Sequence, residues 1–291
     1  MIITAIILNY KNYIDVLSCI RSLEAQKLPN NHSLNILIID NASGDDGTKR
    51  VQAEFPQYKY IYNEKNLGFS KGVNQGIRTS YEESDYFLLV NNDAELEENC
   101  CSELIKESQN EAITGPAIYY KGEPDIIWQG GGSFSRLKMN IVVPDKNKTL
   151  SDTSTASVDF ISGCVMLLPK SAIRKLGGFD EAFYFYGEDL DLCLRAIKKD
   201  IPVKYVKVAK AYHNIKRAAE SRTNSFVLDN LAFSFILLTR KHFPLHLPYA
   251  IVLFIFLYSP FRFYQIIKGG NSTKNIFAWI HGGWRAITTK L

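Results

Sequence analysis

The sequence predicts an α/β protein with a mostly parallel sheet that is flanked by helices. From the first residues onward, short apolar runs alternate with segments in which apolar side chains recur at helical spacing. The clearest run is Phe-Leu-Leu-Val at 87–90, which suits a strand buried on both faces of a parallel sheet. The polar triplet Asn91, Asn92 and Asp93 follows it directly. Ligands of open α/β sheets bind outside the carboxyl ends of the strands, so we expect this triplet to face a binding site.

The other elements follow in order. Residues 2–8 are predicted to form a buried strand. A helix comes next, with apolar residues at helical spacing: Val16, Leu17, Ile20 and Leu23. The further predicted elements are a strand at 34–39, a helix at 48–55, a strand at 58–62, a helix at 72–80 and the strand at 86–90. This alternation indicates parallel strands joined by right-handed crossovers.

Composition and charge restrict the class of protein. The chain has 291 residues, of which 46% are hydrophobic and 22% charged, as in an ordinary folded protein. A net charge of +4 is compatible with anionic ligands or an anionic membrane surface, but it is too weak to indicate nucleic acid. The five cysteines, including the adjacent Cys100 and Cys101, match neither a disulfide framework nor a CxxC metal site, which indicates a reducing cytoplasm. The opening residues predict no signal peptide.

Polar clusters follow the earlier strands too. They are Asn9-Tyr10-Lys11, Asp40-Asn41-Ala42-Ser43 and the loop from Asn66 through Gly68 and Lys71 to Gly72. An aromatic ring can stack on a base, a carboxylate can accept from a base N–H, and a glycine-containing loop at a helix N-terminus suits a phosphate. Each residue also has a structural interpretation, as a packed aromatic, a turn or cap residue, or a turn glycine. Convergence of the clusters on one sheet edge favours a ligand site. The motif G-x-G-x-x-G is absent after the first strand, which counts against an NAD enzyme.

Asp93 itself has two interpretations. A carboxylate at this sheet edge could hold a divalent metal and, through it, a phosphate. Asp is also a favoured N-cap residue, and residues 94–98, Ala-Glu-Leu-Glu-Glu, resemble the first turn of a helix. The local sequence favours the cap, whereas the other polar clusters at the same edge favour the ligand site.

The middle of the chain is less regular. We expect a helix at 101–106, a strand at 113–120 and a polar surface excursion at 145–157. The glycine-rich segment at 128–133 is interpreted either as a mobile loop or as glycines in hairpin turns. A further apolar strand is expected at 158–168.

Paired acids follow an aromatic stretch at 183–186. Glu188 and Asp189 lead into a predicted helix at 190–195, and a carboxylate there could act as the base that an attacking hydroxyl needs. The other interpretation is an N-cap acid, with Asp191 and Arg195 as a surface pair one helical turn apart. Beyond a predicted strand at 203–206 lies His213, an imidazole that could bind a metal or simply be packed.

The tail changes character from about residue 225. A helical apolar face is predicted at 226–238, and residues 247–261 are nearly all apolar and rich in aromatic rings. This second stretch is shorter than the roughly 20 residues of a membrane-spanning helix. Its rings and the basic residues that flank it favour shallow membrane contact over a buried core helix.

Taken in order, these motifs resemble family 2 of the inverting glycosyltransferases, which have the nucleotide-diphospho-sugar (GT-A) fold. The matching motifs are Asn9-Tyr10, Asp40-Asn41-Ala42-Ser43, Asn66-Leu67-Gly68-Phe69, Asn91-Asn92-Asp93 and Gly187-Glu188-Asp189. Within that family the chain is most similar to the bacterial rhamnosyltransferase-like enzymes that build surface polysaccharides.

The resemblance implies a donor site at the sheet edge. In it, Tyr10 and Asp40 contact the base and Asn92 lies near the ribose. The remaining donor-binding residues that it implies are Asn9, Asn41, Asn66, Gly68, Lys71, Asn91 and Asp93.

The resemblance also implies a metal and a base. Asp93 and His213 would hold a divalent cation, Mn²⁺ or Mg²⁺, although Asn91 here replaces the first acid of the DxD-type motif. Asp189 would be the catalytic base, with Glu188 beside it. Lys216 and Arg217 stand where relatives have small residues, and they could contact the diphosphate or be solvated.

We therefore expect a metal-dependent inverting glycosyltransferase that uses a nucleotide-diphospho-sugar donor, with dTDP-rhamnose as the example, and a saccharide acceptor carried on a membrane lipid. The expected domains are a GT-A domain at 1–224 and a helical, membrane-associating extension at 225–291. The expected location is the cytoplasm, peripheral at the inner face of the cell membrane. The alternative is a non-catalytic nucleotide-sugar-binding protein of the same fold, which the replacement at Asn91 keeps open.

Overall fold

The structure is a computed structural model that describes residues 1–215, 224–268 and 273–290. The chain forms two compact units. The sheet unit comprises Met1–Ser133, Val142–Tyr184 and the described residues of Glu188–Lys216. The helical unit comprises Phe134–Ile141, Phe185–Gly187 and the described residues of Arg217–Leu291. Two short segments of the helical unit therefore come from the part of the sequence that otherwise builds the sheet unit.

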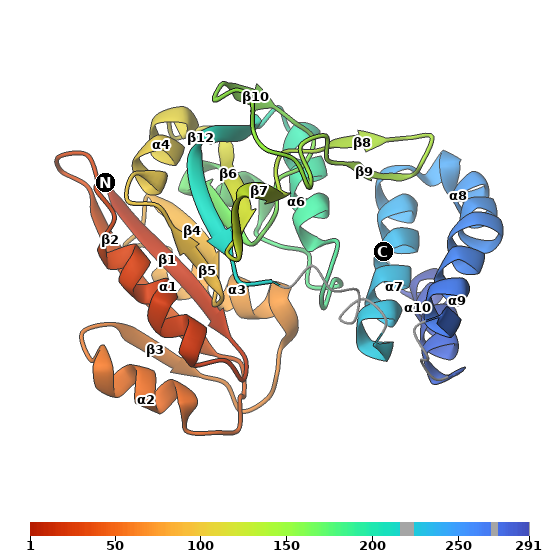
Figure 1. The fold of residues 1–291 in the computed structure, drawn as a ribbon, viewed down its shortest axis with the longest axis horizontal. Helices are drawn as coiled ribbons and strands as arrows, with labels where there is room; N and C mark the ends of the chain where they lie inside the picture. Colours follow the sequence, from red (N-terminus) through yellow and green to blue (C-terminus); the bar gives the residue numbers. More distant parts are fainter. Residues whose placement is uncertain (216–223, 269–272, 291) are drawn as a thin grey trace. The chain divides into compact units, whose positions relative to one another are not determined.

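A mixed sheet forms the centre of the sheet unit (Figure 1). The strand order is β10-β12-β6-β11-β4-β1-β2-β3, with β5 paired to β12 and β7 paired to β6. Its strands are β1 (Ile2–Asn9), β2 (Ser33–Asp40), β3 (Lys59–Tyr62), β4 (Tyr86–Asn91), β5 (Ala94–Leu96), β6 (Ile113–Tyr120), β7 (Glu123–Gln129), β10 (Thr155–Ser157), β11 (Val165–Pro169) and β12 (Val203–His213). Strands β1 to β4 are parallel, whereas β11 runs antiparallel to β4 and β6.

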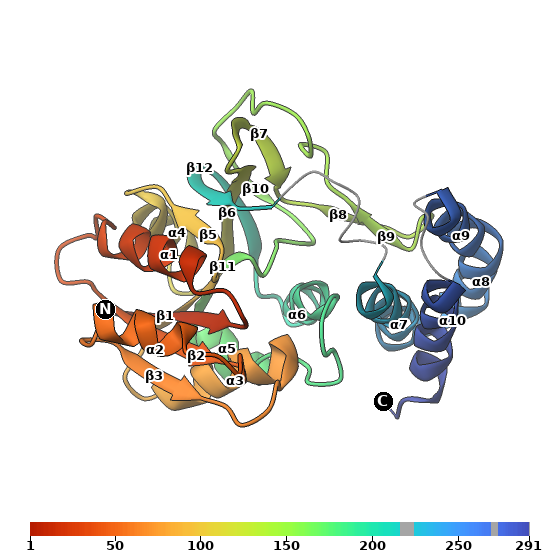
Figure 2. The same ribbon diagram turned by 60° about the horizontal axis from the view of Figure 1, so that its bottom comes forward.

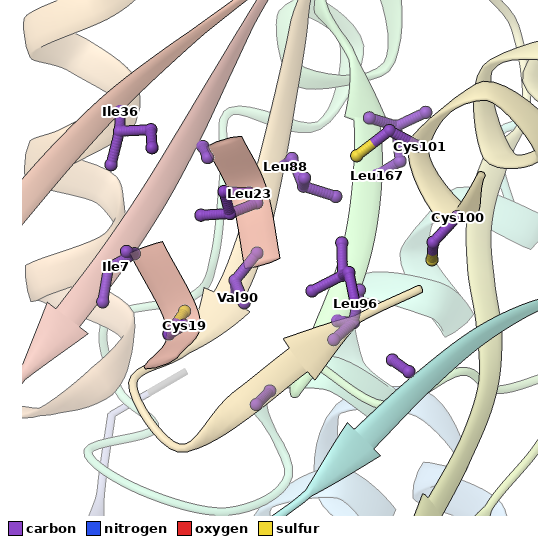
Figure 3. Close-up of a cluster of buried hydrophobic side chains, with 14 of the residues drawn as sticks. Ile7, Cys19, Leu23, Ile36, Leu88, Val90, Leu96, Cys100, Cys101 and Leu167 are labelled. Carbon is purple, nitrogen blue, oxygen red and sulfur yellow. The ribbon is translucent and has the colours of Figure 1, made fainter. Parts of the chain in front are cut away.

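Helices cover both faces of this sheet (Figures 1 and 2). They are α1 (Ile14–Glu24), α2 (Gly47–Glu54), α3 (Gly68–Ser80), α4 (Cys100–Ser108), α5 (Lys170–Leu176) and α6 (Glu188–Ile197). Side chains of α1 and α4, such as Cys19 and Cys101, pack with Ile7 and Leu88 in one buried cluster (Figure 3). Helices α3, α5 and α6 pack in a second cluster, which takes Ile6 from the alternate face of β1. The predicted fold class, a mostly parallel mixed sheet flanked by helices, is confirmed.

The strand order places a topological switch point at β1. The chain runs outward through β1, β2 and β3, and it then returns to add β4 on the other side of β1. The ends of these strands are level, because Asn9 pairs with Asp40 and Leu8 pairs with Asn91. Ligands of open α/β sheets bind in the crevice at such a point. The predicted polar clusters therefore meet where the fold class places a binding site.

The segment after Asp93 corrects one prediction. Residues Ala94–Leu96 form the short strand β5 instead of the first turn of a helix, and α4 begins only at Cys100. Strand β5 runs antiparallel to the end of β12, with Ala94 opposite His213. Pairing with β12 buries Ala94 and Leu96, and this packing outweighs the helical preference of the glutamates around them. Asp93 therefore does not cap a helix.

The glycine-rich segment that follows β7 has a packing role. A Cβ atom on Gly130 would lie 2.8 Å from the hydroxyl of Tyr205, and one on Gly131 would lie 2.6 Å from the Cβ of Tyr205. Gly132 forms an isolated β-bridge with Phe160. Glycine is required here because the backbone lies directly against the buried ring of Tyr205. Neither the mobile-loop interpretation nor the hairpin interpretation gave this reason for the glycines.

The helical unit contains α7 (Ser225–His242) and α10 (Thr273–Thr288), with a long apolar helical segment between them. This segment, Pro244–Lys268, consists of a 3₁₀ turn (Pro244–His246), α8 (Leu247–Leu253), a π turn (Phe254–Tyr258) and α9 (Ser259–Lys268). It has 25 residues and is mostly apolar, so by length and composition alone it could cross a membrane. The predicted stretch of 247–261 underestimated that length. Helix α10 was not predicted, and its Trp279 packs with Leu228 of α7.

Candidate active site

Asn9 organises the edge of the sheet between β1 and β4. It is the last residue of β1 and is buried. Its Nδ2 donates to Oγ1 of Thr48 at 3.0 Å, and its Oδ1 accepts from Nδ2 of Asn92 at 2.7 Å. Both polar groups of Asn9 are therefore used inside the protein, where they fix the orientation of the half-buried Asn92 at the end of β4.

Asp40 and Tyr10 lie in loops that are tied together. Oδ1 of Asp40 accepts from the backbone N of Ser43 at 3.0 Å and from the Ser43 hydroxyl, and that hydroxyl oxygen accepts from the backbone N of Lys11 at 2.9 Å. The turn interpretation of Asp40 and Ser43 therefore holds for Oδ1 alone, since Oδ2 of Asp40 has no hydrogen-bond partner in the described part of the chain. Tyr10 is 45% exposed, so its ring is not a packed core aromatic.

Asn41 and Asn66 hold the loop that enters α3. The side-chain oxygen of Asn41 accepts from the backbone N of Leu67 at 2.9 Å, and its Nδ2 donates to Oδ1 of Asn66 at 2.9 Å. Oδ1 of Asn66 also accepts from the backbone N of Gly68 and from the hydroxyl of Tyr184. These two amides shape the loop, and so both act on the site as positioning residues.

The start of α3 differs from a simple anion-binding loop. The backbone N–H groups of Leu67 and Gly68 donate to Asn41 and Asn66, and that of Phe69 donates to the carbonyl of Tyr184 at 2.8 Å. Because these donors are already used, they are not free for a phosphate. The positive end of the helix dipole and the exposed Lys71 in the first turn remain as the groups here that attract an anion.

Asp93 and His213 are brought together across 120 residues of sequence. Nε2 of His213 lies 2.9 Å from Oδ1 of Asp93, and the antiparallel pairing of β5 with β12 sets this contact. The Trp128 ring packs edge-on against the imidazole, with 4.3 Å between the ring centroids. Burial opposes the charged imidazolium, but the adjacent Cys164 and Asp93 outweigh it and raise the pKa of His213 to about 10.

The donor set of this pair fits a divalent cation once the imidazole has lost its proton, because only the neutral ring offers a nitrogen lone pair to a metal. Two adjacent ligands that each lie about 2.1 Å from an octahedral ion are roughly 3 Å apart, close to the observed separation of 2.9 Å. The described residues contain no group of three or more His, Cys, Asp or Glu side chains that could hold a metal. Asn91, at the position of the missing acid, ends β4 beside the pair. A cation here would need most of its ligands from outside the protein, as Mg²⁺ commonly does with substrate phosphates.

Glu188 and Asp189 begin α6. Oδ2 of Asp189 accepts from the backbone N of Gly163 at 3.2 Å, and Oδ1 accepts from the backbone N of Leu190 at 2.8 Å. Burial raises the pKa of Asp189, although these backbone N–H groups oppose the shift. Burial and the charge of Asp189 raise the pKa of Glu188 well above its usual range, and its Oε2 has no partner among the described residues. Asp189 is therefore the more readily ionised acid of the pair, because two backbone N–H groups stabilise its charge.

The capping interpretation of this helix start is corrected. The helix already includes Glu188, so Asp189 is a first-turn residue and not the N-cap. Asp191 and Arg195 do form the expected ion pair, at 2.7 Å, but Asp191 is fully buried. Arg195 also donates to two backbone carbonyls, so the pair belongs to the interior and not to the surface.

Three neighbours of the site were not assigned a role from the sequence. Trp128 contacts His213, Tyr184 binds Asn66, and Cys164 lies beside His213. Each belongs to a stretch without a recognisable spacing, so the only available signal was the position of Tyr184 just ahead of the paired acids. The predicted contacts of Lys216 and Arg217 fall outside the described residues.

A mixed sheet whose switch point carries amides, a carboxylate–imidazole pair and buried acids is the setting for the comparison with known families. Residues 4–177 match the family described as Glycosyl transferase family 2, and residues 154–218 match the N-terminal domain of galactosyltransferase. Because the first match covers more than half of the sequence, the chain belongs to glycosyl transferase family 2. The resemblance seen in its motifs is thereby confirmed.

Named relatives agree with this assignment. The chain is 27% identical over 219 residues to a low-salt glycan biosynthesis hexosyltransferase of Haloferax volcanii, covering 73% of this chain and 67% of the relative. It is 23% identical over 245 residues to an N-acetylglucosaminyl-diphospho-decaprenol L-rhamnosyltransferase of Mycobacterium tuberculosis, covering 76% and 80%. A rhamnosyltransferase of Escherichia coli is 32% identical over 96 residues, which are 33% of this chain and 35% of the relative. The chain is therefore an enzyme of the hexosyltransferase type.

Solved structures show the same fold. GalNAc-T7 with UDP, GalNAc and Mn²⁺ superposes with a TM-score of 0.64 and 15% identity over 82% of this chain and 47% of that chain. Staphylococcus aureus TarS superposes with a TM-score of 0.54 and 16% identity over 82% and 40%. The chain thus spans about half the length of these proteins, or somewhat less, and the likeness establishes the GT-A fold alone.

Proposed function

We propose that the protein transfers a sugar, with inversion, from a nucleotide-diphospho-sugar to a saccharide acceptor carried on a membrane lipid, with the help of a divalent cation. The observation that carries the proposal is the Asp93–His213 pair, which lies where β4 and β12 end. Rhamnose, from dTDP-rhamnose, is the first sugar to test, because two of the relatives are named as rhamnosyltransferases.

The donor would bind at the carboxyl edge of the sheet. Tyr10 presents an exposed ring that can stack on a base, and Oδ2 of Asp40 is available to accept from a base N–H. Asn92, held by Asn9, would meet the ribose. Lys71 and the start of α3 would attract the diphosphate by charge and by the helix dipole.

Asp93 and His213 would hold the cation in this scheme. A divalent cation bound there would neutralise the negative charge of the leaving nucleoside diphosphate. The paired strands β5 and β12 keep the carboxylate and the imidazole 2.9 Å apart, so that both metal ligands would be in place before the substrate binds. Trp128 restricts rotation of the imidazole by packing against it.

Asp189 would remove the proton from the attacking acceptor hydroxyl. An inverting transfer needs such a base, and Asp189 is the acid of the buried pair that ionises more readily. Two backbone N–H groups orient Asp189 and stabilise its charge. Its raised pKa also makes it a stronger base than an exposed aspartate.

The helical unit would bring the enzyme to the membrane. Residues 225–291 contain seven Lys and Arg but one acidic residue, Asp229, whereas residues 1–224 contain 27 basic and 29 acidic residues. Large apolar side chains are exposed on this unit, namely Phe256, Phe261, Tyr264, Phe277 and Trp284. The unit also has an apolar groove of about 340 Å³ between its helices. Exposed rings with a positive charge are typical of segments that lie in the interface of an anionic membrane.

The alternative is a non-catalytic nucleotide-sugar-binding protein, which the replacement of an acid by Asn91 favours. A thermal-shift panel of nucleotide sugars with and without Mn²⁺ is the first test, because a ligand at 100 times its dissociation constant stabilises the fold by about 2.7 kcal/mol. Metal-dependent stabilisation followed by transfer to a lipid-linked saccharide is expected. Tight donor binding without transfer to any lipid-linked or free saccharide would favour the binding protein.

The membrane part of the proposal has its own test. Truncation after Arg240 would uncover Leu228 and Ala232 of α7, which pack against Trp279. A truncated chain is therefore expected to lose stability whether or not the helical unit binds a membrane. The exposed substitutions Phe256→Ser and Tyr264→Ser avoid this problem. We expect them to move the protein from the membrane fraction to the supernatant while donor binding is kept. An unchanged distribution would argue against the proposed surface.

A further inference from the structure

We propose that the hairpin of β8 (Ser133–Ser135) and β9 (Asn140–Val142) is a second membrane-contact element, which binds the surface of an anionic lipid bilayer. The inference rests on the membrane association proposed above and assigns part of it to a segment far from the tail in sequence. Residues Phe134–Ile141 of this hairpin belong to the helical unit. Figures 1 and 2 both show the tip of the hairpin beside the helical segment that contains α8.

Two tyrosines of the apolar helical segment hold the hairpin tip. The hydroxyl of Tyr249 donates to the backbone carbonyl of Leu137 at 2.7 Å, and the hydroxyl of Tyr258 donates to that of Lys138. The ring of Phe134 stacks on Phe243, with 4.5 Å between centroids and 6° between planes. The two tyrosines use only backbone carbonyls of the tip, and the side chains of Arg136, Leu137 and Lys138 stay exposed.

The side chains of the tip match a bilayer surface. Leu137 is 76% exposed and lies between the exposed Arg136 and Lys138. Within the described part of the chain, neither of these cations forms an ion pair with a carboxylate. The next residue, Met139, is buried with φ of 46°, which turns the chain back toward the unit. One exposed apolar side chain between two cations can enter the hydrocarbon boundary while the charges stay among anionic headgroups.

The surroundings favour a bilayer over a protein partner. The tyrosines that hold the tip belong to the apolar segment Pro244–Lys268, of which Leu245 is 92% exposed and Phe256 is 74% exposed. Asp229, which is the one acid of residues 225–291, is already paired with Arg285 at 2.6 Å. Residues 225–291 therefore carry a net positive charge, which is complementary to anionic lipid.

Sedimentation with vesicles tests the inference on the full chain. The vesicles contain phosphatidylcholine alone or phosphatidylcholine mixed with phosphatidylglycerol. Each Lys or Arg near an anionic surface adds about 1 kcal/mol, so Arg136→Gln with Lys138→Gln should weaken binding to the anionic vesicles roughly 30-fold. Leu137→Ser should weaken binding to both kinds of vesicle, by roughly tenfold. High salt should remove most of the effect of the charge substitutions but not that of Leu137→Ser.

A matched control separates the position of the charge from its amount. Lys59 and Lys198 are exposed in the sheet unit, and Lys59→Gln with Lys198→Gln removes the same charge. This control should bind anionic vesicles as the unmodified protein does. Thermal unfolding and donor binding are measured for every variant, because both should be unchanged if the hairpin variants stay folded.

The outcomes separate the inference from the proposed function. Equal weakening by the hairpin and control substitutions, or no weakening by either, overturns the role of the hairpin and leaves membrane association standing. Failure of the unmodified protein to bind any vesicle overturns both membrane statements. A dimer in sedimentation velocity that the hairpin substitutions abolish would replace the bilayer by a second copy of the chain. Normal vesicle binding without sugar transfer would count against the proposed function alone.

Discussion

The substitution Asp189→Asn tests the proposed chemistry most directly. In the structure Asp189 accepts hydrogen bonds from the backbone N of Gly163 and of Leu190, one at each oxygen. Asparagine keeps the size but has one oxygen, so it can satisfy one of these two N–H groups. The lost hydrogen bond is expected to destabilise the fold by about 1 kcal/mol, which leaves a folded protein.

The effect on the reaction should be much larger. Asparagine cannot take a proton from the acceptor hydroxyl, and a positioned base is worth roughly 10² to 10⁴ in rate. This range corresponds to about 3 to 5 kcal/mol of transition-state stabilisation. The assay is transfer of radiolabelled sugar to the acceptor, with donor affinity measured separately by calorimetry. We expect kcat to fall by this factor. The donor Kd should change less than about twofold, because a base acts in the transition state and does not contribute to donor binding in the ground state.

Glu188→Gln is the matched comparison. Because burial raises the pKa of Glu188 well above its usual range, glutamine is the substitution closest to its uncharged form, and the rate should fall less than about tenfold. If Asp189→Asn weakened donor binding as much as turnover, Asp189 would be a structural residue. If Glu188→Gln were the more damaging substitution, Glu188 would be the base and the role assigned to Asp189 would be wrong.

The remaining predictions concern the metal, the buried acids and the loop before α3. EDTA should abolish transfer, because the cation would neutralise the leaving diphosphate. For the same reason Asp93→Ala should weaken donor binding when Mn²⁺ is present but not when EDTA is present. Full activity in EDTA would refute the metal assignment. Because burial raises the folded-state pKa of Glu188 above its unfolded value, wild-type stability falls as pH rises above 4.5, the ordinary pKa of Glu. The Tm of Glu188→Gln should therefore rise relative to that of the wild type as pH increases above this value; a constant difference would contradict this. Gly68→Ala should cost about 2 kcal/mol or more in urea unfolding, because φ is +78° and a Cβ would lie 2.7 Å from the carbonyl oxygen of Tyr184; an unchanged midpoint would contradict the packing argument.

Local sequence determined much of the sheet. The run at 87–90 and its polar triplet were sufficient to place β4 and its carboxyl end, because a strand buried on both faces leaves a continuous apolar signature. Right-handed parallel connections then bring the ends of β1, β2 and β4 to one edge, so the meeting of Asn9, Asp40 and Asn91 followed from the alternation of elements. The family resemblance added Asp189 and His213, which spacing could not have selected.

Tertiary structure alone decided the details that depend on long-range pairing. Residues 94–96 have a helical local preference, but they form β5 because β12, more than 100 residues later, offers a strand edge that buries Ala94 and Leu96. The backbone N–H groups that were expected to be free before α3 donate hydrogen bonds to Asn41, Asn66 and Tyr184. The hairpin at 134–141 is held by tyrosines more than 100 residues away in the sequence. Local preferences differ by fractions of a kcal/mol per residue, whereas burial and hydrogen-bond satisfaction contribute about 1 kcal/mol or more each. The sequence by itself therefore specified the succession of elements along the chain and the polar edge. The folded chain specified the order of strands in the sheet and which of those polar groups remain available for a substrate.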